Sequence, residues 1–193
     1  MILPITKFGN PVLRETGTEV AAITPEIKQF CQDLLDTMRE SRGVGLAAPQ
    51  IGSAIRVFAV DIRGARFSSS VEFHGKAPAG LKNVVANKRL DGDAVNSLMP
   101  MILINPKVEL SGDVYSAQEG CLSGTPGEYL KVPRNRVAKV SALDKNGEPL
   151  EFTCTNFLAR VIQHENDHLN GILFTDRVVK QGISNKPSPI EIS

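Results

Sequence analysis

Gln163-His164-Glu165-Asn166-Asp167-His168-Leu169-Asn170-Gly171 is the stretch from which the fold and the chemistry of this chain can be worked out. Residues four apart share one face of a helix, so the rings of His164 and His168 can converge on a single metal ion. Glu165 follows the first histidine, where its carboxylate can serve as a base for water at the ion without being a ligand. The spacing therefore predicts two metal ligands and a base on one helix.

Apolar residues before this stretch recur at the helical period of 3.6 residues, which predicts a helix of about four turns. Thr155 or Asn156 can cap its start, and Gly171 can end it. The helical residues that carry this pattern are Phe157, Leu158, Val161 and Ile162.

Two imidazoles make half a metal site, so the third ligand decides the class of enzyme. The long metallopeptidase pattern H-E-x-x-H-x-x-G-x-x-H would need its last histidine at Phe174. The pattern with a glutamate about twenty residues downstream finds only Glu191. The remaining histidine, His74, lies in an irregular stretch. An upstream cysteine or carboxylate is therefore the expected third ligand.

Cys121 is the candidate that this elimination favours. It lies between small and polar neighbours in Gln118–Gly124, where a thiolate would be a soft third ligand. Three protein ligands leave one position open for water, which separates a catalytic site from a structural one. Cys154 competes for the role, but it alternates with Leu150 and Phe152 on one side of a predicted strand. We therefore expect Cys154 to lie in the core.

Composition limits the class of protein. With 193 residues and 41% apolar content, the chain can form one domain, residues 1–193. Lys plus Arg total 22 and Asp plus Glu total 21, so no global charge attracts DNA or a membrane. Three widely spaced cysteines argue against a disulfide framework. No signal-peptide pattern or long apolar run is present, and we predict a cytoplasmic protein.

The rest of the chain predicts a mixture of helices and strands. A helix is expected from Thr24-Pro25 to near Gly43, with Cys31 on its apolar face. We predict residues 62–100 as a surface insertion with one short helix at Leu81–Lys88, and residues 180–193 as a flexible tail. The predicted strands are Ile55–Asp61, Met101–Leu110 with a break at Asn105-Pro106, and a hairpin of Val137–Leu143 and Glu148–Thr155.

The stretch Gly43–Gly52 is small and apolar, and Gln50 is its one polar side chain. Its glycines would allow another backbone to come close, so a substrate chain could pair along it. An ordinary turn between a helix and a strand explains the same composition. The residues alone leave both interpretations open.

Three stretches together resemble the signature motifs of the peptide deformylases. The resemblance runs from about Ile2 to Val178 and departs from the usual pattern in two places. The loop Gly124–Gly127 is one residue longer than usual, and the insertion at 62–100 is longer than the usual connection. The motifs, in chain order, are Gly43-Val44-Gly45-Leu46-Ala47-Ala48-Pro49-Gln50, Glu119-Gly120-Cys121-Leu122-Ser123 and Gln163-His164-Glu165-Asn166-Asp167-His168.

The resemblance implies an α+β fold in which antiparallel sheets pack around a central, C-terminal H-E-x-x-H helix, with a second helix near the N-terminus. It implies removal of the formyl group from N-formylmethionyl nascent peptides, with release of formate, and a contact with the ribosome near the exit tunnel. It also implies one divalent metal ion, Fe²⁺, which Ni²⁺ or Zn²⁺ can replace.

The same resemblance assigns roles to individual residues. Cys121, His164 and His168 would bind the metal, and Glu165 would carry the proton from water to the leaving amine. The Gln50 amide and the backbone N–H of Leu122 would stabilise the oxyanion. Residues expected to contact the peptide backbone are Val44, Gly45, Leu46 and Gly120; those expected to line the methionine pocket are Val44, Phe157 and Val161.

Two other functions remain compatible with part of the pattern. An H-E-x-x-H metallopeptidase that cuts unformylated peptides would need a third ligand that position 174 does not supply. A binding module with a closed zinc site would need a fourth protein ligand, such as His74 or Cys154.

Overall fold

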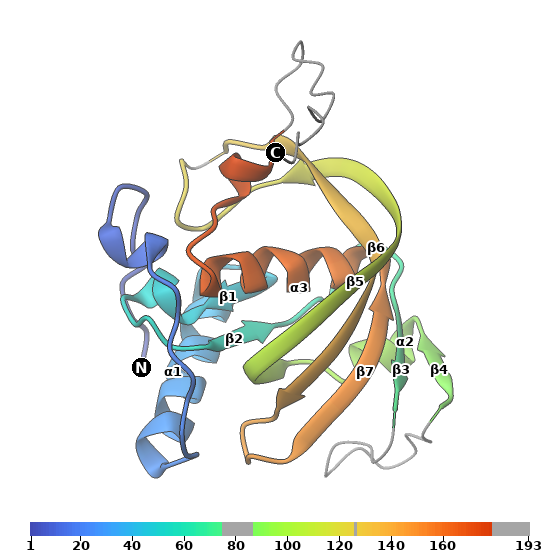
Figure 1. Cartoon of the computed structure of the whole chain (residues 1–193), viewed down its shortest axis with the longest axis horizontal. Coiled ribbons are helices and arrows are strands. Elements are labelled where there is room, and N and C mark those ends of the chain that lie inside the picture. The colour runs from blue at the N-terminus through green and yellow to red at the C-terminus, as the bar shows by residue number, and fades with distance from the viewer. Residues whose placement is uncertain (75–86, 126, 179–193) are drawn as a thin grey trace, which may run out of the picture.

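The computed structural model describes residues 1–74, 87–125 and 127–178, and its elements follow the chain order of Figure 1. The strands are β1 (Gly45–Ala47), β2 (Val57–Val60), β3 (Ser70–Phe73), β4 (Arg89–Asp91), β5 (Met101–Glu119), β6 (Leu130–Leu143) and β7 (Pro149–Thr155). The helices are α1 (Pro25–Glu40), α2 (Asp93–Asn96) and α3 (Asn156–Leu169), with 3-10 turns η1 (Pro11–Arg14), η2 (Ala48–Ile51) and η3 (Phe174–Arg177).

The strands form one seven-stranded sheet in the order β1-β2-β5-β6-β7-β3-β4, and every pair is antiparallel. With few helices beside it, the fold is of the α+β class, as predicted. The resemblance implied several sheets, whereas the described strands make a single one. The reason is the length of β5 and β6, which curve far enough to join both ends of the sheet (Figure 1).

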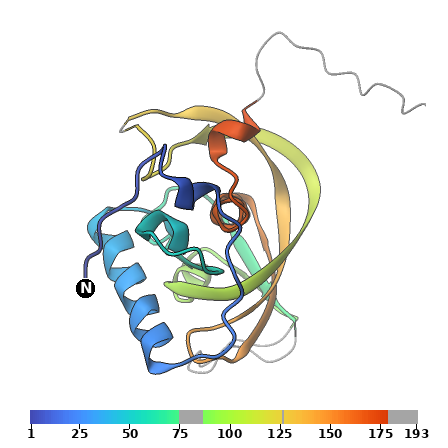
Figure 2. The same ribbon diagram turned by 60° about the vertical axis from the view of Figure 1, so that its left-hand side comes forward.

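Helix α3 lies inside the curve of this sheet. Figure 2 looks nearly along α3, and β5 and β6 arc around it. The helix contacts β6 and β7 on one side and β1 and β2 on the other. It follows Thr155, which has extended backbone angles, and Gly171 comes after it at φ +68°. Almost the whole helix is buried, because the sheet surrounds it on several sides.

Two apolar cores lie on opposite faces of the sheet near β2. Val57 and Ala59 pack toward α1, whereas Phe58 and Val60 pack toward α3, and all four are fully buried. This alternation is the two-residue period of a strand covered on both faces. Cys31 belongs to the α1 core, as its place on the apolar face of that helix predicted.

Strand β5 is longer than the sequence pattern predicted. We expected Met101–Leu110 with a break at Asn105-Pro106, but β5 continues to Glu119. Asn105 has φ +51° where the register with β6 shifts between Ile104 and Lys107, so the supposed break is an irregularity within one strand. The extension matters because it delivers the residues after Glu119 to the side of α3.

The prediction that residues 62–100 form a surface insertion is wrong for part of that segment. Strand β3 pairs with β7 and with β4, and Val71 and Phe73 are fully buried. The alternation in β3 covers only four residues, too few to stand out beside the polar residues around it. The helix expected at Leu81–Lys88 and the tail expected at 180–193 fall largely or wholly outside the described residues.

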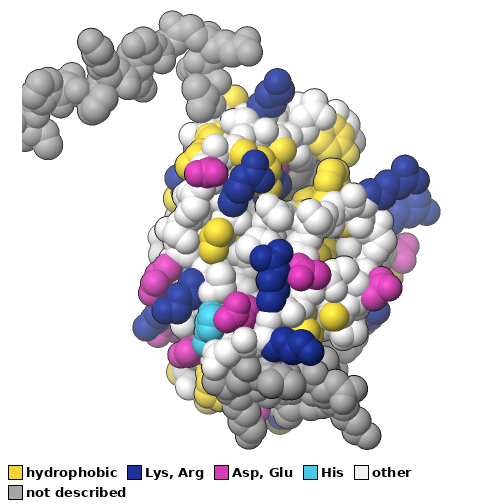
Figure 3. Space-filling view, turned by 90° about the vertical axis from the view of Figure 1, so that its right-hand side faces the viewer, with side chains coloured by type: hydrophobic (Ala, Val, Ile, Leu, Met, Phe, Trp, Pro, Cys, Tyr) yellow, Lys and Arg dark blue, Asp and Glu magenta, His cyan; other side chains and the backbone are white. Residues whose placement is uncertain are grey.

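The surface near β3 and β4 carries charges of both signs. Figure 3 shows basic and acidic side chains interspersed on this face, in keeping with the formal net charge of +1. No helix within residues 1–74, 87–125 and 127–178 is long and apolar enough to cross a membrane.

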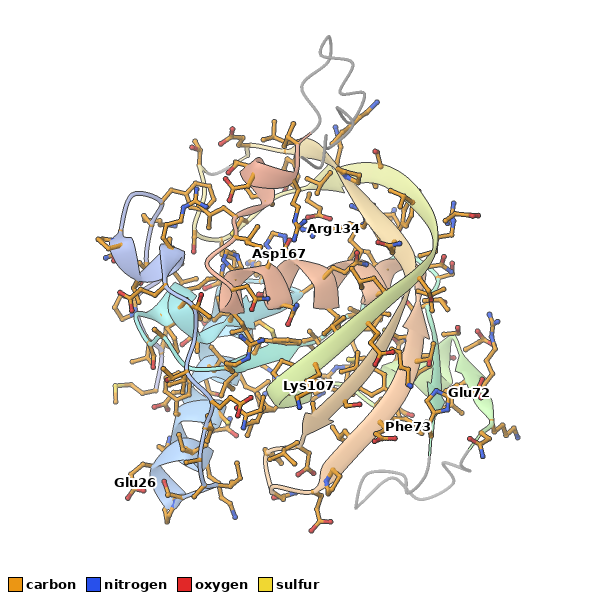
Figure 4. The ribbon with its side chains drawn as sticks, viewed as in Figure 1. Glu26, Glu72, Phe73, Lys107, Arg134 and Asp167 are labelled. Atoms are coloured by element: carbon orange, nitrogen blue, oxygen red, sulfur yellow. The ribbon has the colours of Figure 1, made fainter. Side chains whose placement is uncertain are left out.

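Replacement of Phe73 by Ala tests whether β3 belongs to the core. Because Phe73 is fully buried, we expect Phe73→Ala to lower the free energy of unfolding by about 3–5 kcal/mol. Its neighbour Glu72 points to the other face of β3 and is partly exposed, so Glu72→Ala should cost less than about 1 kcal/mol (Figure 4). Urea unfolding monitored by circular dichroism measures the free energy of unfolding of both variants. Equal values for Phe73→Ala and Glu72→Ala would contradict a core role for β3.

Candidate metal centre

Three predicted ligands from two distant segments meet beside α3. Cys121 comes two residues after the end of β5, and His164 and His168 lie one turn apart on α3. The ligand atoms of the three residues lie within 4.8 Å of one another. Cys121 Sγ is 3.3 Å from His168 Nε2, and the two imidazole centroids are 5.1 Å apart. The fold therefore brings the Cys121 thiol to two imidazoles that lie more than forty positions later in the sequence.

The chemistry of these donors fits a divalent transition metal. One sulfur and two imidazole nitrogens are ligands that suit iron, nickel and zinc. His164 Nδ1 is hydrogen-bonded to Glu119 Oε2 at 3.1 Å, which leaves its Nε2 for an ion. Nδ1 of His168 and Oε2 of Glu165 are buried and lack a hydrogen-bond partner among the described residues.

Glu165 lies against the backbone of β1. Its side chain is close to Gly45, where an added Cβ would overlap Oε1 and lie 2.8 Å from the carboxyl carbon. Glu165 is 4% exposed, and this burial raises the pKa of its carboxyl to about 7. A carboxyl with a pKa near neutrality can both accept and return a proton, which is the requirement for a general acid and base.

The histidines have opposite pKa shifts. Burial alone would lower the pKa of His164, but its interactions with Cys121 and Glu119 outweigh burial and raise the pKa to about 10. Burial and the nearby charge of His164 lower the pKa of His168. The cluster therefore holds a proton on His164 that a metal ion has to displace, so acid should weaken metal binding.

Glu119 is a functional residue that our reading of the sequence missed. Its carboxylate accepts hydrogen bonds from Arg134 Nε at 3.0 Å and from Arg160 Nη1 at 2.6 Å, besides its bond to His164. Although burial opposes ionisation, the bonds with His164 and Arg134 hold the pKa of Glu119 at about 2. Its place two residues before Cys121 in the motif was the available signal.

Asp167 completes this group of buried charges. It accepts from Arg134 Nη1 at 2.5 Å and from Arg177 Nη2 at 2.7 Å, and Arg134 and Asp167 face each other between β6 and α3 (Figure 4). The sequence signal here was its position directly before His168. Together these bonds join the end of β5, β6, α3 and η3 around the candidate ligands.

The two predicted oxyanion donors lie next to Cys121. Gln50 is 1% exposed, and its Oε1 accepts a hydrogen bond from the backbone N–H of Ala47 at 2.8 Å. Its Nε2 is thereby directed to Cys121 Sγ at 3.4 Å and to Ser123 Oγ at 3.3 Å. The carbonyl of Leu122 accepts from Lys7 Nζ at 2.8 Å, which fixes the orientation of that part of the loop.

A cleft of about 610 Å³ runs beside these groups. Leu46 is the one predicted substrate residue that is absent from the cleft wall, because its side chain is buried in the α1 core. Strand β1 is an edge strand of the described sheet and pairs with β2 on its other side. The predicted substrate residues on the wall are Val44, Gly45, Gly120, Phe157 and Val161.

The structure also places the residues on which the rival functions depended. Phe174, at the position of the missing peptidase ligand, is 2% exposed and packs on His164 with ring centroids 6.0 Å apart. His74 is hydrogen-bonded to Thr153 Oγ1 at 2.7 Å, and Cys154 is fully buried against the carbonyl of Ala138. Among the described residues, neither His74 nor Cys154 joins the candidate metal group.

A thiol, two histidines and a buried carboxyl beside one cleft are the parts of a metal-dependent hydrolase. Comparison with known proteins narrows this class. The family described as polypeptide deformylase matches residues 2–183. The chain belongs to the peptide deformylase family, enzymes that remove the N-formyl group from nascent chains, and the family predicted from the three motifs is thereby confirmed.

Individual relatives agree along nearly the whole chain. The peptide deformylase of Opitutus terrae is 38% identical over 183 residues, which cover 94% of this chain and 87% of that protein. The peptide deformylase of Methylacidiphilum infernorum is 38% identical over 176 residues, covering 91% of this chain and 84% of that protein. The crystal structure of peptide deformylase from Thermotoga maritima matches with a TM-score of 0.71 and 30% identity, over 93% of this chain and 99% of that one.

Cysteine replacement separates the two candidate thiol ligands. Mutation of a residue that only supports a ligand typically lowers metal affinity at least about tenfold. Loss of a ligand itself should cost at least as much, so we expect Cys121→Ser to purify with much less metal. Cys154→Ser changes a core thiol away from the group and should keep its metal. Metal content by plasma mass spectrometry decides, and the reverse order would overturn the choice of Cys121.

The packing of Glu165 on Gly45 predicts a second effect. In Gly45→Ala the new Cβ would overlap the Glu165 carboxylate, so that side chain must move. We expect deformylation to fall at least about tenfold while metal content stays normal, because a misplaced base transfers protons poorly. Gly124→Ala is the control on the same cleft and should lose less, because its Cβ would come no closer than 3.4 Å to Phe8 and to the Cys121 carbonyl. Unchanged turnover in Gly45→Ala would rule out this contact as a requirement.

Proposed function

We propose that the protein hydrolyses the formamide bond of N-formylmethionyl peptides at a metal centre held by Cys121, His164 and His168. The observation that carries this proposal is the convergence of the three motifs on one cleft, with the ligand atoms within 4.8 Å and Glu165 beside them. Fe²⁺ is the ion we expect, with Ni²⁺ or Zn²⁺ as substitutes, since the donor set suits all three. A bound ion supplies Lewis acidity, which lowers the pKa of water and polarises the formyl oxygen.

Glu165 is the proposed proton carrier. Its buried carboxyl, with a pKa of about 7, takes a proton from the water that attacks the formyl carbon. The same carboxyl then gives that proton to the leaving amine, so the peptide departs with a free N-terminus and the second product is formate. The packing on Gly45 supports this role, because it holds the carboxylate in one place.

Gln50 and Leu122 are the proposed donors to the oxygen that becomes negative as the water adds. The bond from Ala47 N–H to Gln50 Oε1 fixes the amide, so its N–H₂ group faces the cysteine. The bond from Lys7 to the Leu122 carbonyl restrains the Leu122–Ser123 peptide unit, which adjoins the unit that carries the Leu122 N–H. One such donor is typically worth about 3 kcal/mol of transition-state stabilisation.

The peptide is proposed to lie along β1, the outer strand of the described sheet, with its backbone beside Val44 to Leu46. Backbone hydrogen bonds to a strand tolerate many sequences, which suits an enzyme that acts on different nascent chains. The methionine side chain would enter the part of the cleft walled by Phe157 and Val161. Gly120, on the cleft wall, leaves room for the chain.

Action on nascent chains also bears on where the protein works. We propose that it acts in the cytoplasm and approaches the ribosome near the exit tunnel, where new N-termini emerge. Co-sedimentation of the protein with purified ribosomes would test the second point, and a protein that stays in the supernatant would contradict it.

Glu165→Ala separates the proton carrier from the metal ligands. The variant should keep its metal but lose activity by about 10²–10⁴-fold, the usual contribution of a general acid or base. The assay is release of formate from formyl-Met-Ala-Ser by protein reconstituted with iron under anaerobic conditions. Metal-loaded Glu165→Ala with wild-type turnover would refute the role.

The same assay tests the function as a whole. We expect wild-type protein to release formate from formyl-Met-Ala-Ser and to leave unformylated Met-Ala-Ser intact. Cleavage of internal bonds in unformylated peptides would instead support a metallopeptidase.

A further inference from the structure

Phe67 is a large apolar side chain left 66% exposed beside the cleft. It belongs to the segment 62–100, yet it forms part of the cleft wall together with Phe157 and Val161. Its ring rests on the ring of Phe157, with centroids 4.8 Å apart and planes tilted by 33°. An exposed aromatic side chain at the edge of a binding cleft is a surface that a bound ligand can cover.

The position of Phe67 is fixed by the start of α3. Thr155 is the N-cap residue, but its side chain makes no capping hydrogen bond. The serines that follow Phe67 do this instead: Ser69 Oγ accepts from Leu158 N–H at 3.0 Å, and the Ser68 carbonyl accepts from Phe157 N–H at 3.5 Å. The first turn of the helix is thus capped by another part of the chain.

A third bond strengthens this attachment. The backbone N–H of Ser70 donates to Thr155 Oγ1 at 3.2 Å, and Ser69 and Ser70 are both buried. Ser70 is also the first residue of β3, which pairs with β7. Phe67 therefore lies three residues before β3 and directly before Ser68, whose carbonyl caps α3. These bonds hold the backbone that follows Phe67 against the start of the helix.

The helix also gives the distance of Phe67 from the candidate ligands. Phe157 lies seven positions before His164, which is two turns or about 10 Å along the helix axis. Val161 lies between them on nearly the same face. Phe67, stacked on Phe157, thus lies on the cleft wall about two helical turns from His164.

We propose that Phe67 is a specificity-determining residue that covers the thioether end of the substrate methionine. This inference rests on the proposed function, in which the formyl group is held at the ligands and the side chain extends past Val161 toward Phe157. The Phe67 ring gives the methionine sulfur a favourable contact. It also covers the terminal methyl group, which removes apolar surface of both side chains from water. The chain just before β3 thereby contributes, through Phe67, to the choice of the first residue.

Kinetics on two substrates test the proposal. For Phe67→Ala we expect kcat/KM on formyl-Met-Ala-Ser to fall about 3- to 10-fold, mainly through KM, the size of effect that a sulfur–aromatic contact supports. On formyl-Ala-Ala-Ser, whose first side chain is too short to reach the ring, the change should stay below about twofold. Phe67→Leu, which keeps an apolar cover, should recover part of the loss.

Matched controls assign the outcome. Leu110→Ala removes another exposed apolar side chain, 48% exposed on β5 and outside the cleft, and should alter neither substrate. Equal losses on both substrates in Phe67→Ala, or no loss on either, would overturn the inference while wild-type activity still supports the proposed function. Absence of formate release from metal-loaded wild-type protein would overturn the proposed function and this inference with it.

Discussion

The hydrogen bond between Glu119 and His164 is the interaction on which the arrangement of the site depends. Glu119 ends β5, and Cys121 follows two residues later, whereas His164 is in the middle of α3. The carboxylate is bonded on its other sides by Arg134 and Arg160, so it cannot turn away from the imidazole. This one group therefore fixes the distance between the segment that carries the thiol and the helix that carries the histidines.

Such a cluster has a cost for stability. Taking charged side chains out of water is unfavourable, and a buried ion pair is often no more stabilising than well-packed apolar residues. Here Glu119, Arg134, Arg160 and Asp167 are each less than 10% exposed. Removing one partner would leave an unpaired buried charge, at a cost of about 3–5 kcal/mol. The benefit is orientation, because a ligand held by an outer carboxylate keeps one ring nitrogen for the metal.

The two histidines of the candidate site and Glu165 could be predicted from the sequence because their spacing depends only on the geometry of one helix, whereas Cys121 followed from elimination of the other candidate ligands. Helix α3 runs over the residues where the 3.6-residue period predicted it. The course of β5 past Leu110 could not be predicted, since alternation weakens where both faces of the strand meet solvent. The buried β3 was missed because Val71 and Phe73 stand alone among polar neighbours. The cap that Ser69 gives α3 joins positions 89 apart, a contact that local patterns do not encode.

The central claim is that one thiolate and two imidazoles hold an ion that keeps room for solvent. X-ray absorption spectroscopy of the metal-loaded protein measures the ligand shell directly. With zinc, the account predicts one sulfur at about 2.3 Å, two nitrogens at about 2.0–2.1 Å and a remaining oxygen from solvent. A shell without sulfur, or one filled by four protein atoms, would contradict it.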